Sequence, residues 1–323
     1  MLLLSRVRVL ALVGLALAHV ANAYGQLATI GLLAPDEEPR YSEIASGLTQ
    51  VLRELGYSER TVQIRDGRVQ RGDSKAARAA ADGFVTQRVS VIFAVGSVLA
   101  RIARESSPTV PIVFITPGDP VAAGLVASLA RPGGNMTGMT FEYPELSAKR
   151  LELLQDVAPH VRRVLVLYDP RDASSRQGVA AAREAAAKLK IVLVEREVRT
   201  DIEVARGLMA LNEVDALLAI PGGITSGHYE NITREANAKQ RPTIFHARTN
   251  GSQDSLLSYG ARDTEIAGAA ARLVDKILKG ANAGSLPVER PTRIALTINL
   301  KTAKMLGLKI PHSVLLRAEE VVQ

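Results

Sequence analysis

The sequence predicts an α/β protein with two lobes, each a doubly wound parallel sheet. Short runs rich in Val, Ile and Leu alternate with segments whose apolar residues recur at helical spacing, the pattern of strands joined by crossover helices. The interior strands are nearly continuous apolar runs, as expected where helices cover both faces of a sheet. The alternation occurs as two similar series, beginning near residues 27 and 144, and each is long enough for a lobe.

The first series begins with an apolar strand at 27–33. The helix that follows places Ile44, Leu48 and Leu52 on one face and ends at Gly56, a residue suited to the left-handed conformation that ends helices. We then expect strands at 61–65, 89–95 and 110–116, with helices beginning at Asp73 and near Val98.

The second series begins at Pro144, a favourable first residue for a helix. It predicts helices at 144–156, 174–189, 201–211 and 226–239, and strands at 161–168, 191–195, 214–220 and 243–246. The tail adds a helix at 263–279, a strand at 293–298 and a short capped helix at 299–306. We expect these last elements to join the existing lobes.

The N-terminus has the order of a secretory signal peptide. Arg6 and Arg8 precede the apolar run 9–18, and Ala21-Asn-Ala23 provides the small residues that a signal peptidase recognises. A retained anchor helix is the alternative, but the run is too short to cross a bilayer. We therefore expect residues 1–23 to be removed and the mature chain to be periplasmic.

Composition excludes several classes of protein. The chain has no cysteine, which removes disulfides, thiolate metal sites and a lipid-modified cysteine. Arg6 and Arg8 account for two of the +7 formal charges, leaving +5 in the mature chain, and its Lys and Arg residues are scattered among acidic ones. With aromatic residues at only 4%, no nucleic-acid partner is expected. We expect a soluble monomer.

The sequence shows no catalytic or metal-binding pattern. His160, His228, His246 and His312 lack metal-ligand spacing, and no serine lies in a nucleophile-elbow motif. Gly133-Gly134 lacks the spacing of a dinucleotide fingerprint and is interpreted as a loop. We therefore expect no enzyme activity and no cofactor.

Candidate ligand-binding loops follow the strands, because ligands of open parallel sheets lie beyond the carboxyl ends of strands. Four such loops carry glycine or polar residues, at 34–41, 96–98, 116–120 and 221–225. They are the places where we expect a small molecule to bind.

Individual residues in these loops have both a ligand-binding and a purely structural interpretation. Gly96-Ser97 turns directly into a helix, whose N–H groups and hydroxyl suit a carboxylate, although a serine there also serves as an ordinary N-cap. Gly222 and Gly223 offer backbone N–H groups from the second lobe, or simply permit a turn. Asp119 suits a ligand ammonium group, or bonds its own backbone.

Several long segments resemble one family. The segment 112–138 contains Ile-Val-Phe-Ile-Thr-Pro-Gly-Asp-Pro and continues to Asn-Met-Thr-Gly, and segments 145–154, 274–280 and 298–308 extend the similarity. Together they resemble a bacterial family of ABC-transporter substrate-binding proteins whose relatives bind tryptophan and other aromatic amino acids. The resemblance spans most of the mature chain.

This resemblance implies the type I periplasmic-binding-protein fold, in which two lobes joined by three crossings enclose a ligand. The crossings fall near 141–144, 258–260 and 289–293. The implied lobes are 24–142 plus 260–290, and 143–259 plus 291–323. The implied partner is an ABC permease in the inner membrane; the alternative is a ligand-sensing receptor module for a membrane signalling partner.

The resemblance also places further residues at the ligand. Thr140 and Phe141, at the first crossing, are expected to line the cleft, and Tyr41 or Tyr259 to add an apolar wall. We expect a small organic ligand with a carboxylate, such as an amino acid. The chain departs from the family at 96–98, where many relatives have Gly-Thr-Pro, and at 221–223, where others carry bulkier residues. The fold is expected to survive these changes, whereas the identity of the ligand stays open.

Overall fold

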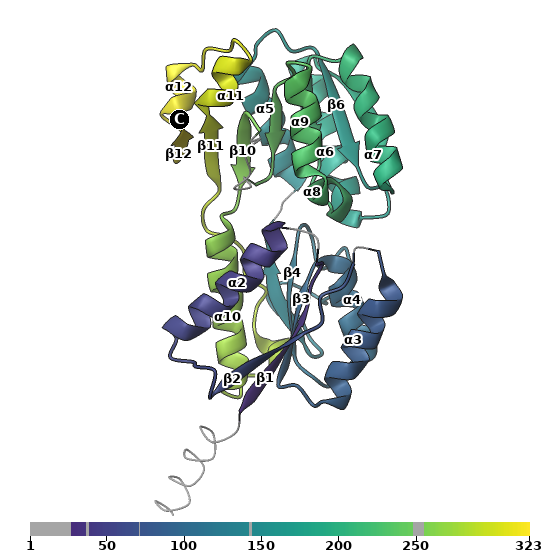
Figure 1. Cartoon of the computed structure of the whole chain (residues 1–323), viewed down its shortest axis with the longest axis vertical. Coiled ribbons are helices and arrows are strands. Elements are labelled where there is room, and N and C mark those ends of the chain that lie inside the picture. Colours follow the sequence, from purple (N-terminus) through teal and green to yellow (C-terminus); the bar gives the residue numbers. More distant parts are fainter. Residues whose placement is uncertain (1–26, 37–38, 71, 142–143, 248–254) are drawn as a thin grey trace, which may run out of the picture.

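The computed structural model describes residues 27–36, 39–70, 72–141, 144–247 and 255–323. These residues form two α/β lobes, one above the other in Figure 1. The signal peptide predicted at 1–23 lies outside the described residues. Within the described ranges, no helix has both the length and the apolar composition needed to cross a membrane.

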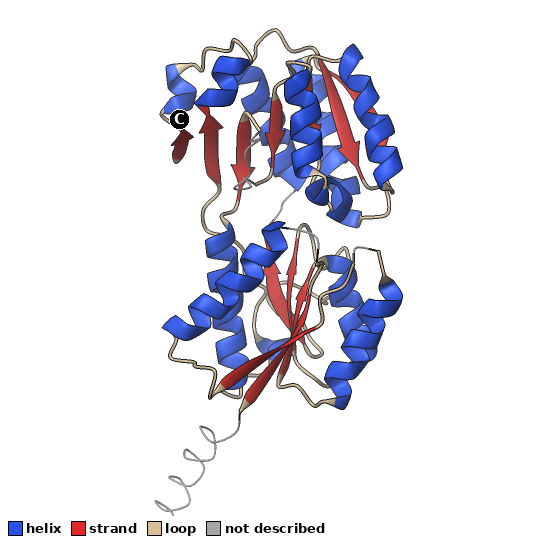
Figure 2. Ribbon diagram, in the orientation of Figure 1, coloured by secondary structure: helices blue, strands red, loops and turns tan. Residues whose placement is uncertain are grey.

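The first lobe is a five-stranded sheet in the order β2-β1-β3-β4-β5, with every neighbouring pair parallel. Its strands are β1 (Ala28–Leu33), β2 (Val62–Asp66), β3 (Val91–Val95), β4 (Ile112–Thr116) and β5 (Met136–Thr140). Its helices are α2 (Pro39–Glu54), α3 (Ser74–Thr86), α4 (Ser97–Ser106) and α10 (Asp263–Leu278). One apolar cluster lies under α2 and α10 and another under α3 and α4, so both faces of the sheet are covered (Figure 2).

The second lobe is a seven-stranded sheet in the order β12-β11-β10-β9-β8-β6-β7. Its strands are β6 (Arg163–Tyr168), β7 (Val192–Glu197), β8 (Ala216–Ala219), β9 (Thr243–Phe245), β10 (Leu257–Gly260), β11 (Ala295–Asn299) and β12 (Glu320–Val322). Only β10 and β11 pair antiparallel among these described strands. Its helices are α5 (Pro144–Val157), α6 (Ala173–Leu189), α7 (Asp201–Leu208), α8 (Gly223–Gly227), α9 (Tyr229–Ala238), α11 (Leu300–Met305) and α12 (His312–Leu315).

The chain passes between the lobes more than once. Helix α10 packs against α2 of the first lobe, whereas β10 before it and β11 after it pair with each other in the second sheet. Met139 of β5 also pairs with Glu289, which keeps the segment before β11 beside the first lobe. The prediction of two parallel-sheet α/β lobes is confirmed. The residue limits of the lobes stay a prediction, because 142 and 143 lie outside the described residues.

Several elements of the structure were absent from the sequence prediction. β5 (Met-Thr-Gly-Met-Thr) and β10 (Leu-Ser-Tyr-Gly) lack the apolar run that marks the other interior strands. At the centre of β5, a Cβ on Gly138 would lie 2.1 Å from the Phe114 carbonyl oxygen, so close packing requires glycine there. The helix predicted at 226–239 is instead two helices, α8 and α9, separated at His228. The short terminal elements α12 and β12 were also not predicted.

Candidate ligand-binding site

Four loops lie at the carboxyl ends of strands, and two of them bring the lobes into contact. Loops 96–98 and 116–120 follow β3 and β4 of the first lobe, and loops 169–175 and 221–225 follow β6 and β8 of the second. The Ser174 hydroxyl donates a hydrogen bond of 2.5 Å to the Pro117 carbonyl oxygen. The carboxyl edges of the two sheets therefore face each other, and we call these four segments the interlobe loops.

The loop after β3 presents a helix N-terminus to this region. Gly96 is the N-cap of α4, with a φ of 100° that favours glycine, and its N–H donates to the Ile115 carbonyl oxygen. Ser97 is the first helical residue, and its hydroxyl is hydrogen-bonded to that of buried Thr116 instead of capping the helix. The first N–H groups of α4 have no partner within the helix, which suits an anion.

Asp119 is held by its own loop. Its Oδ1 accepts hydrogen bonds from the N–H groups of Val121 at 2.8 Å and Ala122 at 3.3 Å. This is the turn interpretation of the residue, and it uses one of the two carboxylate oxygens. The side chain is partly exposed and lies in the loop at the carboxyl end of β4.

Thr140 and Phe141 lie beneath the loop that carries Asp119. The Thr140 hydroxyl donates to the Gly118 carbonyl oxygen. Phe141 is 1% exposed and belongs to the core cluster under α2 and α10, while its N–H donates to the Thr116 carbonyl oxygen. Both residues therefore support the loop from below.

In the second lobe, Gly222 lies against the N-terminus of α6. A Cβ at this position would lie 2.6 Å from the Ser175 hydroxyl oxygen, and the Ser175 hydroxyl donates to the Pro221 carbonyl oxygen at 2.6 Å. Gly223 begins α8, where Thr225 donates to the Ile220 carbonyl oxygen. The glycine at 222 thus permits the close approach of two interlobe loops.

The two candidate tyrosines, Tyr259 and Tyr41, lie in different lobes. Tyr259 lies on β10, is half-buried and packs on the core of the second lobe. Its carbonyl oxygen accepts a hydrogen bond of 2.8 Å from Nε of Arg150, which is completely buried. Tyr41 lies on α2, but its side chain falls outside the described part of the structure.

The sequence prediction missed the loop 169–175. Asp172 caps α6 by accepting hydrogen bonds from the N–H groups of Ser174 and Ser175. Burial raises the pKa of the Asp172 carboxyl above its ordinary value, although the two N–H donors oppose this shift. The signal was present in the sequence, because Asp-Pro-Arg-Asp-Ala-Ser-Ser follows the predicted strand 161–168 directly, as the other candidate loops follow theirs.

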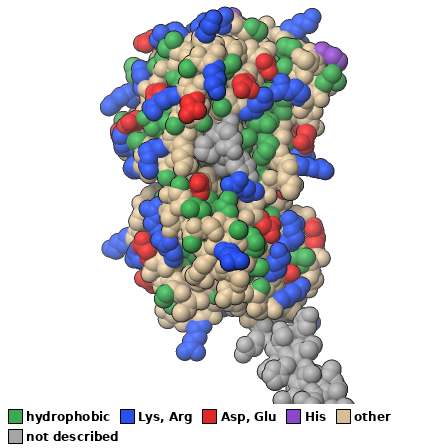
Figure 3. All heavy atoms as spheres, turned by 180° about the vertical axis from the view of Figure 1, so that it is seen from behind, with side chains coloured by type: hydrophobic (Ala, Val, Ile, Leu, Met, Phe, Trp, Pro, Cys, Tyr) green, Lys and Arg blue, Asp and Glu red, His purple; other side chains and the backbone are tan. Residues whose placement is uncertain are grey.

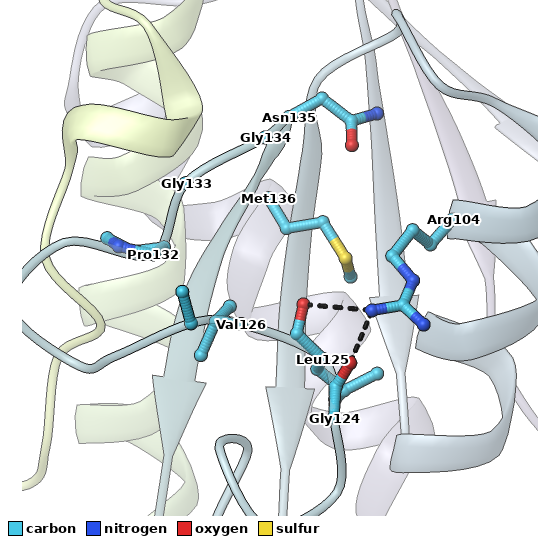
Figure 4. Close-up of a pocket in the computed structure, with 10 residues that line it drawn as sticks. Arg104, Gly124, Leu125, Val126, Pro132, Gly133, Gly134, Asn135 and Met136 are labelled. Atoms are coloured by element: carbon cyan, nitrogen blue, oxygen red, sulfur yellow. Dashed lines mark hydrogen bonds between the residues drawn. The ribbon is translucent and has the colours of Figure 1, made fainter.

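A cavity of about 350 Å³ lies away from the interlobe loops. It is bounded by Arg104 and the segment 124–136, and the Arg104 guanidinium donates to the carbonyl oxygens of Gly124 and Leu125 (Figure 4). Arg104 is in the last turn of α4 and Met136 begins β5, so the cavity is at the amino ends of the strands. None of the predicted ligand-binding residues lines it.

Charges of both signs are spread over the surface. On the face in Figure 3, Lys and Arg side chains are interspersed with Asp and Glu over both lobes. Among the described residues, no group of three or more His, Asp or Glu side chains is placed to hold a metal ion.

The chain is similar to known proteins over nearly its whole length. A "Tyrosine-binding protein" of Clostridioides difficile (strain R20291) is 26% identical over 281 residues, which cover 87% of this chain and 81% of that protein. The ABC domain in complex with L-Trp from Streptococcus pneumonia is 24% identical, with a TM-score of 0.85 over 92% of this chain and 100% of the other. The ligand-free, open structure of a substrate binding protein with adhesive properties from Clostridium difficile is 23% identical, with a TM-score of 0.68 over the same shares.

These likenesses confirm the two-lobed type I periplasmic-binding-protein fold expected from the resemblance. The sequence model of the family described as "ABC transporter substrate binding protein" matches residues 29–322, almost the entire described chain. This protein therefore belongs to the ABC transporter substrate binding protein family.

Proposed function

We propose that this protein is the periplasmic substrate-binding component of an ABC importer and encloses an amino acid between its lobes. The observation that carries the proposal is the meeting of the carboxyl edges of both sheets, where Ser174 of one lobe contacts Pro117 of the other. Aromatic amino acids are the first candidates, because the similar proteins include a tyrosine-binding protein and a structure in complex with L-Trp. The predicted signal peptide supports export, and the family supports an inner-membrane permease as partner.

In this proposal, different interlobe loops contact different parts of the ligand. The N-terminus of α4 with Gly96 and Ser97 binds the ligand carboxylate. The carboxylate oxygen of Asp119 that does not cap the turn pairs with the ammonium group. Tyr259 supplies an apolar wall, and Gly222 and Gly223 approach from the second lobe, while Thr140 and Phe141 support the loop from below.

The lobes of this chain stand, we propose, in the closed arrangement. The TM-score is 0.85 against the L-Trp complex and 0.68 against the open, ligand-free protein, although both are almost equally identical in sequence to this chain. The hydrogen bond between Ser174 and Pro117 supports the same assignment, because it requires the lobes to touch.

Calorimetry on the mature protein tests the ligand class. L-tryptophan and L-tyrosine are compared with tryptamine, which lacks the carboxylate, and with indole-3-propionate, which lacks the ammonium group. We expect one of the amino acids to bind and each analogue to bind about ten- to a hundredfold more weakly, since each loses a charge-assisted hydrogen bond. Failure of amino acids to bind, or equal binding of the analogues, contradicts the proposal.

Two substitutions test the assigned residues with whichever amino acid binds. Ser97→Ala and Asp119→Asn are each expected to weaken binding about ten- to a hundredfold. Asparagine keeps the oxygen that caps the turn, so the second change removes the charge while preserving the loop. Asp82→Asn, an exposed position on α3, is the matched control. Unchanged affinity in both variants, with folding intact, would move the site elsewhere.

A further inference from the structure

The two lobes touch at a contact that does not involve the crossings. Ser174 lies in the first turn of α6 in the second lobe, and Pro117 lies in the loop after β4 in the first. Both residues are buried, and the Ser174 hydroxyl donates to the Pro117 carbonyl oxygen at 2.5 Å. We call Pro117, Gly118 and Ser174 the interlobe contact.

Gly118 shows how closely the lobes approach. Its φ of +94° favours glycine, and a Cβ there would lie 2.0 Å from the Ser174 hydroxyl oxygen and 2.2 Å from its Cβ. Nothing larger than hydrogen fits between the loop and α6. The two lobes therefore reach this separation only because residue 118 has no side chain.

The contact adjoins the residues assigned to the ligand without including them. The Gly118 carbonyl oxygen accepts the Thr140 hydroxyl, Asp119 is the next residue in the chain, and Thr116 is hydrogen-bonded to Ser97. Closing the lobes onto Pro117 and Gly118 thus fixes the loop that carries Asp119.

We infer that the interlobe contact holds the lobes closed without ligand, and that Ser174 acts as a positioning residue for closure. The inference rests on the proposed function only in assuming that an open state also exists. A buried hydroxyl–carbonyl hydrogen bond shifts such an equilibrium by about two- to tenfold. Since apparent affinity scales with the population of the binding-competent state, Ser174 raises ligand affinity by at most the same factor.

Ser175 provides a matched control for Ser174. It is the next residue of the same helical turn, is also buried, and donates its hydroxyl to the Pro221 carbonyl oxygen at 2.6 Å. That bond stays within the second lobe. Ser175→Ala removes an equivalent hydrogen bond without changing the contact between lobes.

The lobe separation is measured by double electron–electron resonance. The chain contains no cysteine, so labels attach only at Cys introduced for Ala79 on α3 and for Ile202 on α7. Both side chains are exposed, with Ile202 at 71%, and the two helices lie on the same side of the two lobes (Figure 1). Measurements are made without ligand and with saturating L-tryptophan.

Without ligand, we expect the parent chain to populate a short and a long separation. Ser174→Ala should lower the ratio of short to long about two- to tenfold, whereas Ser175→Ala should leave the ratio as in the parent. A parent chain with only the long separation, or equal ratios in the two alanine variants, overturns the inference. Because these measurements need no ligand, failure of L-tryptophan to bind counts against the proposed function alone.

A second set of variants tests the close approach between Gly118 and Ser174. Gly118→Ala should shift the population to the long separation, and Ser174→Gly in the same chain should restore part of the short one. Gly124→Ala is the control for backbone strain, because Gly124 has a φ of +69° but a Cβ there would have no atom within 4 Å. Equal effects of the Gly118 and Gly124 substitutions, with folded protein verified by circular dichroism, contradict the inference.

Discussion

At the scale of single residues, buried polar side chains are stabilised by hydrogen bonds to backbone groups. Arg150 is the clearest case, because its guanidinium is completely buried on α5 and its Nε donates to the carbonyl oxygen of Tyr259. Burying a cation is costly unless its donors are hydrogen-bonded, and removing the arginine leaves the carbonyl oxygen unpaired in a medium of low dielectric constant.

Arg150→Ala should therefore lower the free energy of unfolding by about 2–5 kcal/mol in guanidinium chloride titrations, because it leaves a cavity and an unpaired carbonyl oxygen. The matched control is Arg183→Ala, which removes an arginine whose pair with Glu195 lies at the surface. That change should cost less than about 1 kcal/mol. Similar losses for the two variants would mean that burial of Arg150 contributes little.

Asp215 should make stability depend on acidity. Burial by itself would raise its pKa, but hydrogen bonds from the N–H groups of Arg162 and Arg163 outweigh it, so the pKa of Asp215 lies below its usual 3.8. A lowered pKa in the folded state adds stability above pH 3.8 that disappears as pH falls through the folded-state pKa.

The prediction for Asp215 is tested with Asp215→Asn. We expect the parent chain to exceed this variant in free energy of unfolding at pH 7, and the difference to shrink as pH falls below about 4. Chemical unfolding measured from pH 7 to pH 3 gives both curves. A difference that stays constant with pH contradicts the assignment.

At the scale of elements, N-cap residues fix the first turns of helices, including the helix that carries Ser174. Asp73 caps α3 and Asp172 caps α6, each through a carboxylate oxygen that accepts backbone N–H groups. The two caps differ in surroundings, since α6 carries Ser174 into contact with the first lobe, whereas α3 packs beside α4 on the first sheet.

Asp172→Ala and Asp73→Ala should each cost about 1 kcal/mol in the free energy of unfolding, the usual cost of a lost N-cap. Only Asp172→Ala should also weaken ligand binding, because its cap orients the turn that carries Ser174. Chemical unfolding and calorimetry on both variants provide the comparison. Equal affinities in the two variants would separate α6 from the binding function.

At the scale of the whole molecule, the chain builds two separately packed lobes that are joined by several crossings. Each lobe has apolar clusters of its own, and the lobes meet at the interlobe loops. Ligand that contacts both lobes therefore favours the state in which they touch.

Saturating ligand should reduce the radius of gyration measured by small-angle scattering, with the protein monomeric throughout. The reduction should be larger in Ser174→Ala than in the parent chain, because the variant begins from a more open population. No reduction in either protein with a confirmed ligand would exclude closure about the crossings.

Prediction from sequence succeeded for strands in which several apolar residues follow one another. The strands predicted at 89–95, 110–116 and 161–168 each contain a run of at least four consecutive apolar residues, and their structural counterparts β3, β4 and β6 are almost completely buried. It failed for β5 and β10, whose Thr, Ser and Gly residues become strand only by pairing with neighbours already in place. Three of the four interlobe loops were predicted as ligand-binding loops. The fourth, 169–175, was missed although it also follows a predicted strand, 161–168.

The sequence by itself determined the two α/β series and most of their strands and helices, because each depends on residues within a few positions of one another. Only the tertiary structure decided that Ser174 lies on Pro117, 57 residues earlier and in the other lobe. The same holds for Asp119, whose loop is supported from below by Thr140 and closed from above by α6. The physical reason is that such contacts depend on the relative placement of two separately packed cores, which no local pattern encodes.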